Sequence, residues 1–204
     1  VLTTGRYAFW KGYLDNTFTK IDLSKVEITE AVPVALLENI KVRAYTRKYQ
    51  VLNFEKGLLF VNGAFVKELA AGNYYFWNNA TPIEVKNVDI RQQQMEIAGQ
   101  ELLTKDKATL RINFFVRYQV IDAVKALVNN KEYDKQLYVL MQLALRALVG
   151  SYTLDELLNK KDTISKEILE NMLEKINALG LSVADAGIRD VILPGDMKEI
   201  MNQV

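Results

Sequence analysis

The spacing of apolar side chains changes along the chain, from a period of two to a period of three or four. Between Thr109 and Val120 apolar and polar residues alternate, which predicts a long strand with one buried side. Further strands are predicted over 74–77 and 82–90, with Pro82 at a strand start, where a missing N–H costs least. On the long strand, the residues assigned to the buried side are Leu110, Ile112, Phe114, Val116, Tyr118 and Val120.

The second half of the chain has helical spacing. Residues 132–149 predict an amphipathic helix that ends at Gly150. Thr153 and Glu156 form a capping box that begins a short helix over 154–159. A longer helix is predicted from about Thr163 to Gly180, and its apolar stripe consists of Ile164, Ile168, Met172, Ile176 and Leu179.

The end of the sequence returns to a strand pattern over 181–193. Gly187 is a candidate bulge, and Pro194 would stop the strand. Residues 195–204 have the pattern of another helix at its start. Strands first, then helices, then a final strand indicate the α+β class.

One phrase occurs twice. Leu2, Gly5, Tyr7, Phe9 and Trp10 recur 67 positions later as Leu69, Gly72, Tyr74, Phe76 and Trp77, and Asp22 recurs as Asp89. Such a fixed spacing indicates a duplicated structural unit, although chance similarity between aromatic-rich strands is an alternative. Asn62-Gly63 predicts a tight hairpin before the second copy. Because the first copy lacks this hairpin, we expect residues 1–48 to be a truncated first β unit, cut upstream in a fragment of a longer protein.

The amino-acid composition excludes several kinds of catalytic and binding site. The 204 residues carry 26 basic and 25 acidic side chains, so no global field favours nucleic acid. The absence of His and Cys excludes Ser/His/Asp and Cys/His nucleophile systems and zinc sites built from Cys and His. Carboxylate pairs such as Glu170 and Glu174 are not by themselves a catalytic set. We therefore expect no enzyme activity, no cofactor and no metal site. No apolar run of about 18 residues is present that would span a membrane.

Several ordered segments resemble the stomatin/prohibitin/flotillin (SPFH, or band-seven) domain. In "LTKDKATLRINFFVRYQVID", Thr104, Lys105, Asp106 and Asp122 match the central motif of that family. The segments "ELAAGNYYFW", "LALRALVGSYTLDELLNKKDTI" and "LGLSVADAGIRDVILP" are similar to its early, middle and closing parts. The resemblance implies an SPFH domain over 49–200, with a twisted, mainly antiparallel sheet and packed helices. The most similar subgroup is the bacterial stomatin-like slipins.

The resemblance also implies a role. It predicts a membrane-associated oligomeric scaffold that organises membrane proteins or lipids through ring-like or cage-like assembly. A membrane anchor and a coiled coil are expected outside these residues, with the bacterial cytoplasmic membrane as the location. The implied partners are copies of the chain, membrane lipids, and a membrane protease or a small barrel-domain membrane protein. The alternative is a regulatory binding module that contacts a membrane protease directly.

Two groups of residues are candidate contacts. Tyr13, Tyr75 and Trp77 are candidates for membrane or partner contact, because Tyr and Trp suit an interface with one apolar and one wet side. Ordinary strand packing is the alternative, and we favour it for the Phe and Trp side chains. Lys166, Glu170 and Glu174 on the long helix are candidates for oligomer contact. Their alternative is a solvated face with weak pairs within the helix.

Overall fold

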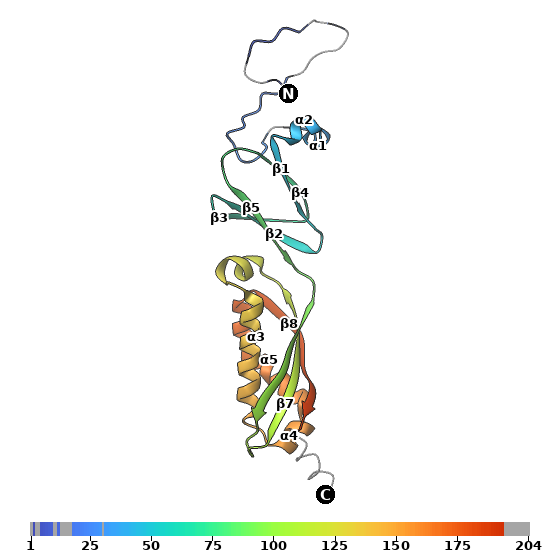
Figure 1. Ribbon diagram of the computed structural model, residues 1–204, viewed down its shortest axis with the longest axis vertical. Coiled ribbons are helices and arrows are strands. Elements are labelled where there is room, and N and C mark those ends of the chain that lie inside the picture. The colour runs from blue at the N-terminus through green and yellow to red at the C-terminus, as the bar shows by residue number, and fades with distance from the viewer. Residues whose placement is uncertain (1, 3–4, 10–11, 13–17, 30, 194–204) are drawn as a thin grey trace. The chain divides into compact units, whose positions relative to one another are not determined.

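The computed structural model describes residues 2, 5–9, 12, 18–29 and 31–193, and the chain divides into two compact units. Unit 1 combines residues 1–53 with 57–87, and unit 2 combines residues 54–56 with 88–204. Strands dominate the first unit and a sheet with helices forms the second, so the expected α+β class is confirmed (Figure 1). The strands divide among three sheets rather than forming one.

Unit 1 is built from short strands with two helical turns before them. β1 pairs antiparallel with β4, and β2 lies between β3 and β5. Asn62 and Gly63 have φ of 53° and 77°, the positive values that the predicted hairpin between β2 and β3 requires. The elements are α1 (Val34–Leu37), α2 (Ile40–Arg43), β1 (Thr46–Val51), β2 (Glu55–Val61), β3 (Ala64–Leu69), β4 (Gly72–Trp77) and β5 (Ile83–Asp89).

A segment from early in the chain completes this unit. The Asn79 side-chain amide donates to the backbone carbonyls of residues 23–25 at 2.7–3.3 Å. The Trp77 N–H donates to the Val26 carbonyl at 3.0 Å, which adds this segment beside β4. Val26 also packs against the core of unit 1, whose buried members are Val51, Leu59, Leu69, Phe76 and Ile83. Residues 23–26 therefore belong to the same compact unit as β4.

The two copies of the repeat share an Asx turn but differ in secondary structure. Asp22 and Asp89 each accept a hydrogen bond from the backbone N–H two residues later, at 3.0 and 2.9 Å, as in an Asx turn. The second copy forms the end of β3 and all of β4, whereas residues 5–9 of the first copy form neither helix nor strand. Trp10 lies outside the described residues. The duplicated β unit and its boundary at residue 48 therefore stay predictions.

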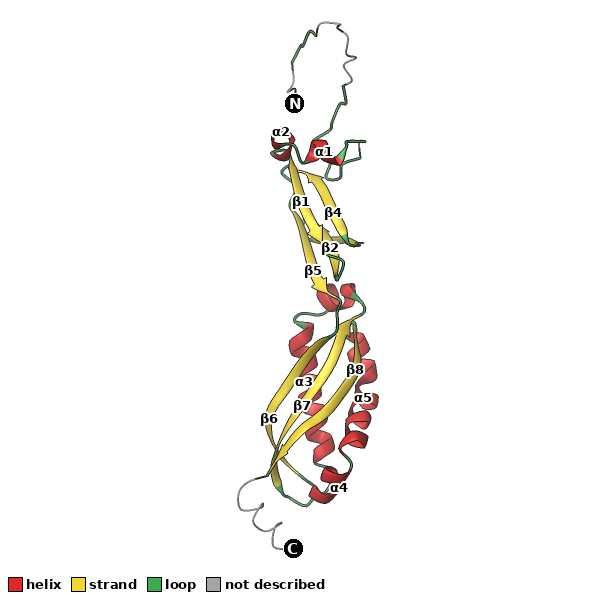
Figure 2. Ribbon diagram, turned by 90° about the vertical axis from the view of Figure 1, so that its right-hand side faces the viewer, coloured by secondary structure: helices red, strands yellow, loops and turns green. Residues whose placement is uncertain are grey.

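Unit 2 is an antiparallel sheet in the order β6-β7-β8 with helices on one face (Figure 2). Buried and exposed side chains alternate along β7 with the predicted period of two, and the predicted inward residues are all buried. The elements are β6 (Gln93–Leu103), β7 (Thr109–Val120), the π-helical turn η1 (Lys125–Asn129), α3 (Tyr133–Val149), α4 (Leu154–Asn159), α5 (Lys161–Ala178) and β8 (Leu181–Ile192).

Most local predictions for unit 2 are confirmed. α3 has the expected extent, and Gly150 follows it with right-handed backbone, φ −63°. The capping box of Thr153 and Glu156 is present at α4. α5 begins at Lys161, two residues before the expected Thr163. Pro194 and the helix expected over 195–204 lie outside the described residues.

Gly187 is not a bulge. It pairs in register with Phe115, and the two register shifts between β7 and β8 lie on either side of that pair. A Cβ atom at Gly187 would stand 2.8 Å from Cε1 of the Phe115 ring. The glycine is therefore explained by the close approach of an aromatic ring from the neighbouring strand.

The turn between α5 and β8 is fixed against the end of β7. Gly180 has φ of 77°, and its carbonyl accepts hydrogen bonds from the N–H groups of Ile121 and Asp122, at 2.9 and 3.0 Å. A Cβ atom at Gly180 would stand 2.4 Å from the Asp122 carbonyl oxygen and 3.0 Å from the Ala126 nitrogen. Both the backbone conformation and the lack of space therefore require glycine.

We expect Gly180→Ala to destabilise unit 2 much more than Gly99→Ala. Gly99 also has positive φ, 62°, but nothing lies within 4 Å of its added Cβ. Gly99→Ala should cost about 1–3 kcal/mol for the left-handed conformation alone, and Gly180→Ala should add the clash with backbone. Urea unfolding of both variants measures the difference. Equal losses of stability would contradict the close approach at Gly180.

Candidate functional site

The described depressions of the surface contain few of the side chains that catalysis requires. One, of about 260 Å³, is lined by Glu101, Thr109, Leu110, Arg111, Ile192 and Leu193. This and two other depressions contain a single carboxylate residue each: Glu101, Glu96 and Glu132. Within the described residues, no group of three or more Asp and Glu side chains is placed to hold a metal ion. The remaining candidates for function are therefore residues on exposed surfaces.

The Thr104–Asp106 motif has a structural task. The Thr104 hydroxyl is buried, donates to the Asp106 carboxylate and accepts from the Ala108 N–H at 3.0 Å. Asp106 also accepts from the Leu154 N–H at 3.2 Å, at the first turn of α4. The hydrogen bond from Thr104, with a smaller contribution from Leu154, holds the pKa of Asp106 below its ordinary value of 3.8. The motif therefore ties the β6–β7 turn to α4.

Tyr75 belongs to a cluster that fixes α1 to the strands of unit 1. Its hydroxyl donates to the Glu38 carboxylate, and Lys48 Nζ lies 2.6 Å from the same oxygen. Lys48 also lies over the Tyr75 ring, 5.6 Å from its centroid. The hydrogen bonds from Lys48 and then Tyr75 hold the pKa of Glu38 below its ordinary value, and the bond to Glu38 raises the pKa of Tyr75. Glu38 is the C-cap residue of α1, so the cluster anchors that helix.

Beside this cluster the two short helices expose aliphatic side chains. Val34, Leu36 and Ile40 are 60%, 50% and 86% exposed, and we call them the α1–α2 patch. Lys41 and Arg43 follow within α2, whose N-terminus is capped by the side chain of Asn39. Leu37 is buried and fixes α1 on the unit. Three aliphatic side chains this exposed, next to cations, make the α1–α2 patch a candidate interaction surface.

The aromatic candidates behave differently from one another. Trp77 is 1% exposed, so the structure corrects its expected membrane contact: the side chain lies in the core, as the packing interpretation predicted. Phe76 is also buried. Tyr75 is half-buried and bonded to Glu38 at the edge of the α1–α2 patch, and its contact role stays a prediction. Tyr13 lies outside the described residues.

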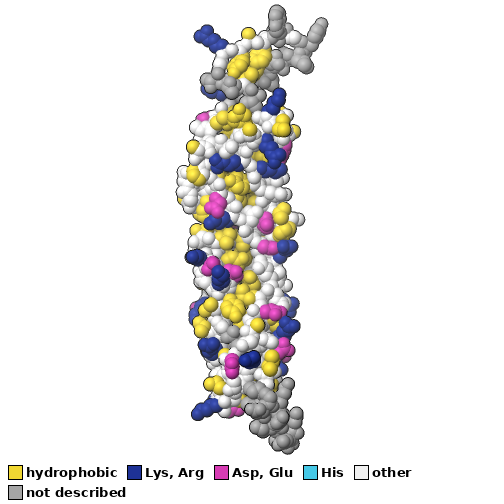
Figure 3. All heavy atoms as spheres, viewed as in Figure 1, with side chains coloured by type: hydrophobic (Ala, Val, Ile, Leu, Met, Phe, Trp, Pro, Cys, Tyr) yellow, Lys and Arg dark blue, Asp and Glu magenta, His cyan; other side chains and the backbone are white. Residues whose placement is uncertain are grey.

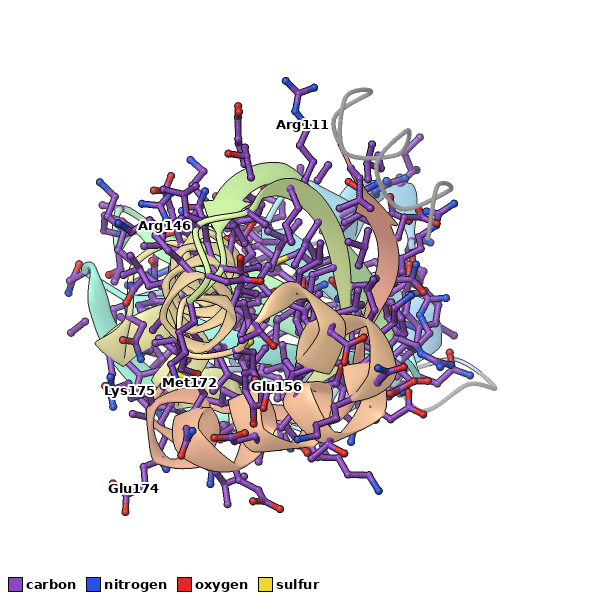
Figure 4. All side chains as sticks on the ribbon, turned by 90° about the horizontal axis from the view of Figure 1, so that it is seen from below. Arg111, Arg146, Glu156, Met172, Glu174 and Lys175 are labelled. Carbon is purple, nitrogen blue, oxygen red and sulfur yellow. The ribbon has the colours of Figure 1, made fainter. Side chains whose placement is uncertain are left out.

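The helix candidates Lys166, Glu170 and Glu174 are all exposed on α5. They share the side of the helix opposite the buried Ile164 and Ile168. The weak intrahelical pair considered for Lys166 and Glu170 does not appear among the ion pairs of the described residues. Glu174 points outward from the helix layer, while Arg111 points away from it on the opposite side of the sheet (Figure 4). These side chains are available for an intermolecular contact, which stays a prediction.

The α1–α2 patch is not among the surfaces that the sequence pattern predicted. Helices of four residues are too short to display a helical period. A signal was present nonetheless: apolar residues at 34, 36, 37 and 40, next to Lys41 and Arg43, predict an amphipathic turn.

Comparison with known proteins agrees with this architecture. Residues 49–204 match the family described as SPFH domain / Band 7. An uncharacterized protein of Methanocaldococcus jannaschii is 33% identical over 75% of this chain and 76% of its own length. A stomatin homolog of Pyrococcus horikoshii is 31% identical over 74% of this chain and 56% of its own. Stomatin-1 of Caenorhabditis elegans is 25% identical over 89% of this chain and 52% of its own length. The chain thus spans about half the length of the last two.

We expect Asp106→Asn to make the free energy of unfolding of unit 2 depend less on pH in the acid range. Because the pKa of folded Asp106 is lowered, its charge stabilises the fold above the unfolded-state value near 3.8. That contribution is lost as the pH falls through the lowered folded pKa. The wild-type chain should therefore be more stable than the variant at pH 6, and the difference should shrink in strong acid. Urea titrations at a series of pH values measure it, and a difference independent of pH would contradict the assignment.

Proposed function

The chain belongs to the SPFH/Band 7 family as a stomatin homologue, and we propose that it is part of a membrane-associated oligomeric scaffold of the stomatin type. Stomatin-family proteins are membrane-associated and generally non-enzymatic. None of the helices within the described residues is long and apolar enough to cross a membrane. The proposal therefore assigns the described part of the chain to contacts at the membrane surface and between copies.

The α1–α2 patch is the observation that carries the membrane contact. Full burial of an aliphatic side chain is worth about 1.5–3 kcal/mol, and Val34, Leu36 and Ile40 all start at least half exposed. Cations near an anionic lipid surface add about 1 kcal/mol each, and Lys41 and Arg43 stand beside these side chains. The carboxylate of Glu38, which would repel such a surface, is paired with Lys48 at 2.6 Å.

The rest of unit 1 holds the α1–α2 patch in place. The Glu38–Lys48–Tyr75 cluster holds α1 on the β1–β4 pair, so the patch is presented in one orientation. A preorganised surface loses less conformational freedom on binding than a mobile segment. The aromatic contact expected for Tyr75 becomes, in this proposal, a supporting role beside the aliphatic side chains that would enter the headgroup layer.

Assembly into rings or cages is the second part of the proposal. The formal net charge of +1 allows many copies to pack closely, and Lys166, Glu170 and Glu174 are exposed on one helix. A contact between two different surface patches generates a ring when its rotation closes. Lipids and copies of the chain are the proposed partners, and a coiled coil or an anchor elsewhere in the protein would add to this contact.

We expect Ile40→Ser to weaken binding to lipid vesicles by about tenfold or more, because it removes the most exposed aliphatic side chain of the α1–α2 patch. Val66→Ser is the matched control, since Val66 is 51% exposed on β3 of the same unit but outside the patch. Flotation of the 204-residue chain with phosphatidylcholine vesicles, with and without phosphatidylglycerol, measures binding. Wild-type protein should float, and more so with the anionic lipid.

Two results would contradict the membrane proposal. Wild-type chain that floats with neither kind of vesicle would remove the surface contact altogether. Equal loss of binding in Ile40→Ser and Val66→Ser would show that the α1–α2 patch has no special part in it. Circular dichroism of both variants checks that unit 1 remains folded. Co-purification with a membrane protease, independent of lipid, would instead favour the regulatory-module alternative.

A further inference from the structure

α3 is apolar on two opposite sides. Leu137, Met141 and Leu145 are fully buried on the side that faces the sheet and α5. Val139 and Leu143 are each two residues from Met141, about 200° around the helix, and they are 49% and 57% exposed. The side of an amphipathic surface helix that faces away from the core is normally polar, so these two exposed side chains form a candidate contact surface. Apolar side chains therefore reach the surface among charged ones on the side of the molecule where α3 lies in front (Figure 3).

A shallow depression of about 380 Å³ runs along this exposed side. Its apolar floor consists of Val139, Leu140 and Leu143. We call these three residues, together with the polar residues that line the same depression, the α3 stripe. One end carries Lys131 and Lys135, of which Lys135 pairs with Glu132 at 2.7 Å. The lining residues are Lys131, Glu132, Lys135, Gln136, Val139, Leu140 and Leu143. The surface around the stripe therefore has more cations than anions.

α5 presents a second stripe with the opposite charge balance. Leu173 is 58% exposed, and Leu169 one turn earlier is half-buried. Glu170 and Glu174 lie beside these leucines on the outward side of the helix, together with Lys166. We call Leu169 and Leu173 with these charged neighbours the α5 stripe. Its anions complement the cations at the end of the α3 stripe.

We propose that the α3 stripe of one copy packs against the α5 stripe of a second copy. This inference rests on the proposed function, since it names the surface through which the scaffold assembles. α3 lies beside β6 and α5 beside β8, so the helices that carry the two stripes lie towards opposite edges of the sheet (Figure 2). A contact between two such different patches is head-to-tail and can continue from copy to copy around a ring.

The directions and ends of the two helices define the register that we propose for the contact. α3 has 17 residues and runs towards α4, whereas α5 has 18 and runs away from it. Copies that stand in the same orientation therefore bring α3 of one antiparallel to α5 of the next. Counted from the N-terminus of α3 and the C-terminus of α5, which lie on the side away from α4, Val139 is within one residue of the level of Leu173. Leu143 is likewise within one residue of the level of Leu169.

The same register also brings charged residues of α3 close to charged residues of α5. Lys135 lies within one turn of the level of Glu174, which favours the contact. Arg146 lies within one residue of the level of Lys166, so like charges meet at the other end. The register therefore predicts opposite effects for two charge changes on α5. Lys166→Glu should strengthen association, and Glu174→Lys should weaken it, each by about two- to fivefold.

Disulfide trapping tests the contact directly, because the chain contains no Cys. Val139→Cys protein is mixed with Leu173→Cys protein on phosphatidylglycerol-containing vesicles and in solution, and mild oxidation follows. Ile121→Cys is the matched control, since Ile121 is 59% exposed in the same unit and Leu173 is 58% exposed. We expect the Val139–Leu173 disulfide to form at least about tenfold faster than the Val139–Ile121 disulfide, because only the first pair is held together.

The outcomes separate this inference from the proposed function. Equal rates for the two mixed pairs, or faster joining of Val139→Cys to itself, would overturn the α3–α5 contact. If wild-type chain nevertheless forms large particles by sedimentation, the scaffold stands and another surface assembles it. Wild-type chain that stays monomeric both in solution and on vesicles would overturn assembly itself. Association changed by Lys166→Glu and Glu174→Lys in the directions opposite to those expected would also overturn the register.

Discussion

The pairing of β7 with both of its neighbours is the constraint on which unit 2 depends. β7 is hydrogen-bonded to β6 on one edge and to β8 on the other, and every second side chain is buried. That buried row is the surface on which α3 and α5 lie, and Gly180 fixes the return of the chain from α5 to β8. The helices can expose candidate contact surfaces because the sheet holds them from one side.

The opposite face of the same sheet has a different character. Arg117 pairs with Asp185 across β7 and β8, and Arg189 lies 2.9 Å from Glu96 of β6. Exposed pairs of this kind contribute little to stability, but they keep the open face of the sheet polar. Exposed apolar side chains of unit 2 therefore lie in two places: on the helices, in the α3 and α5 stripes, and near the ends of the strands, where Leu103 and Ile192 are exposed. Unit 1 has its own exposed aliphatic side chains in the α1–α2 patch, so the proposed membrane contact and the proposed copy-to-copy contact involve different elements.

The sequence predicted the elements that local patterns encode. Alternation located β7, the capping box of Thr153 located α4, and Asn62-Gly63 located the β2–β3 turn. It failed where distant residues decide. Trp77 is buried although it alternates with buried Phe76, and the segment at residues 23–26, far earlier in the chain, attaches at that end of β4. The reason for Gly187 is likewise a ring on the neighbouring strand. The candidate surfaces divide similarly. The charges of α5 and the apolar spacing over residues 34–40 are visible in the sequence, but the exposure of the α1–α2 patch and of the α3 stripe is known only from the fold.

The central claim is that the chain assembles at a membrane surface. Mass photometry of the wild-type chain on a supported bilayer containing phosphatidylglycerol tests it most directly, because this measurement weighs single bound particles. The account predicts particles with the mass of many copies on the bilayer, and predicts far fewer bound particles when Ile40 is replaced by Ser. Bound particles that all have the mass of one chain, 23.3 kDa, at saturating coverage would contradict it.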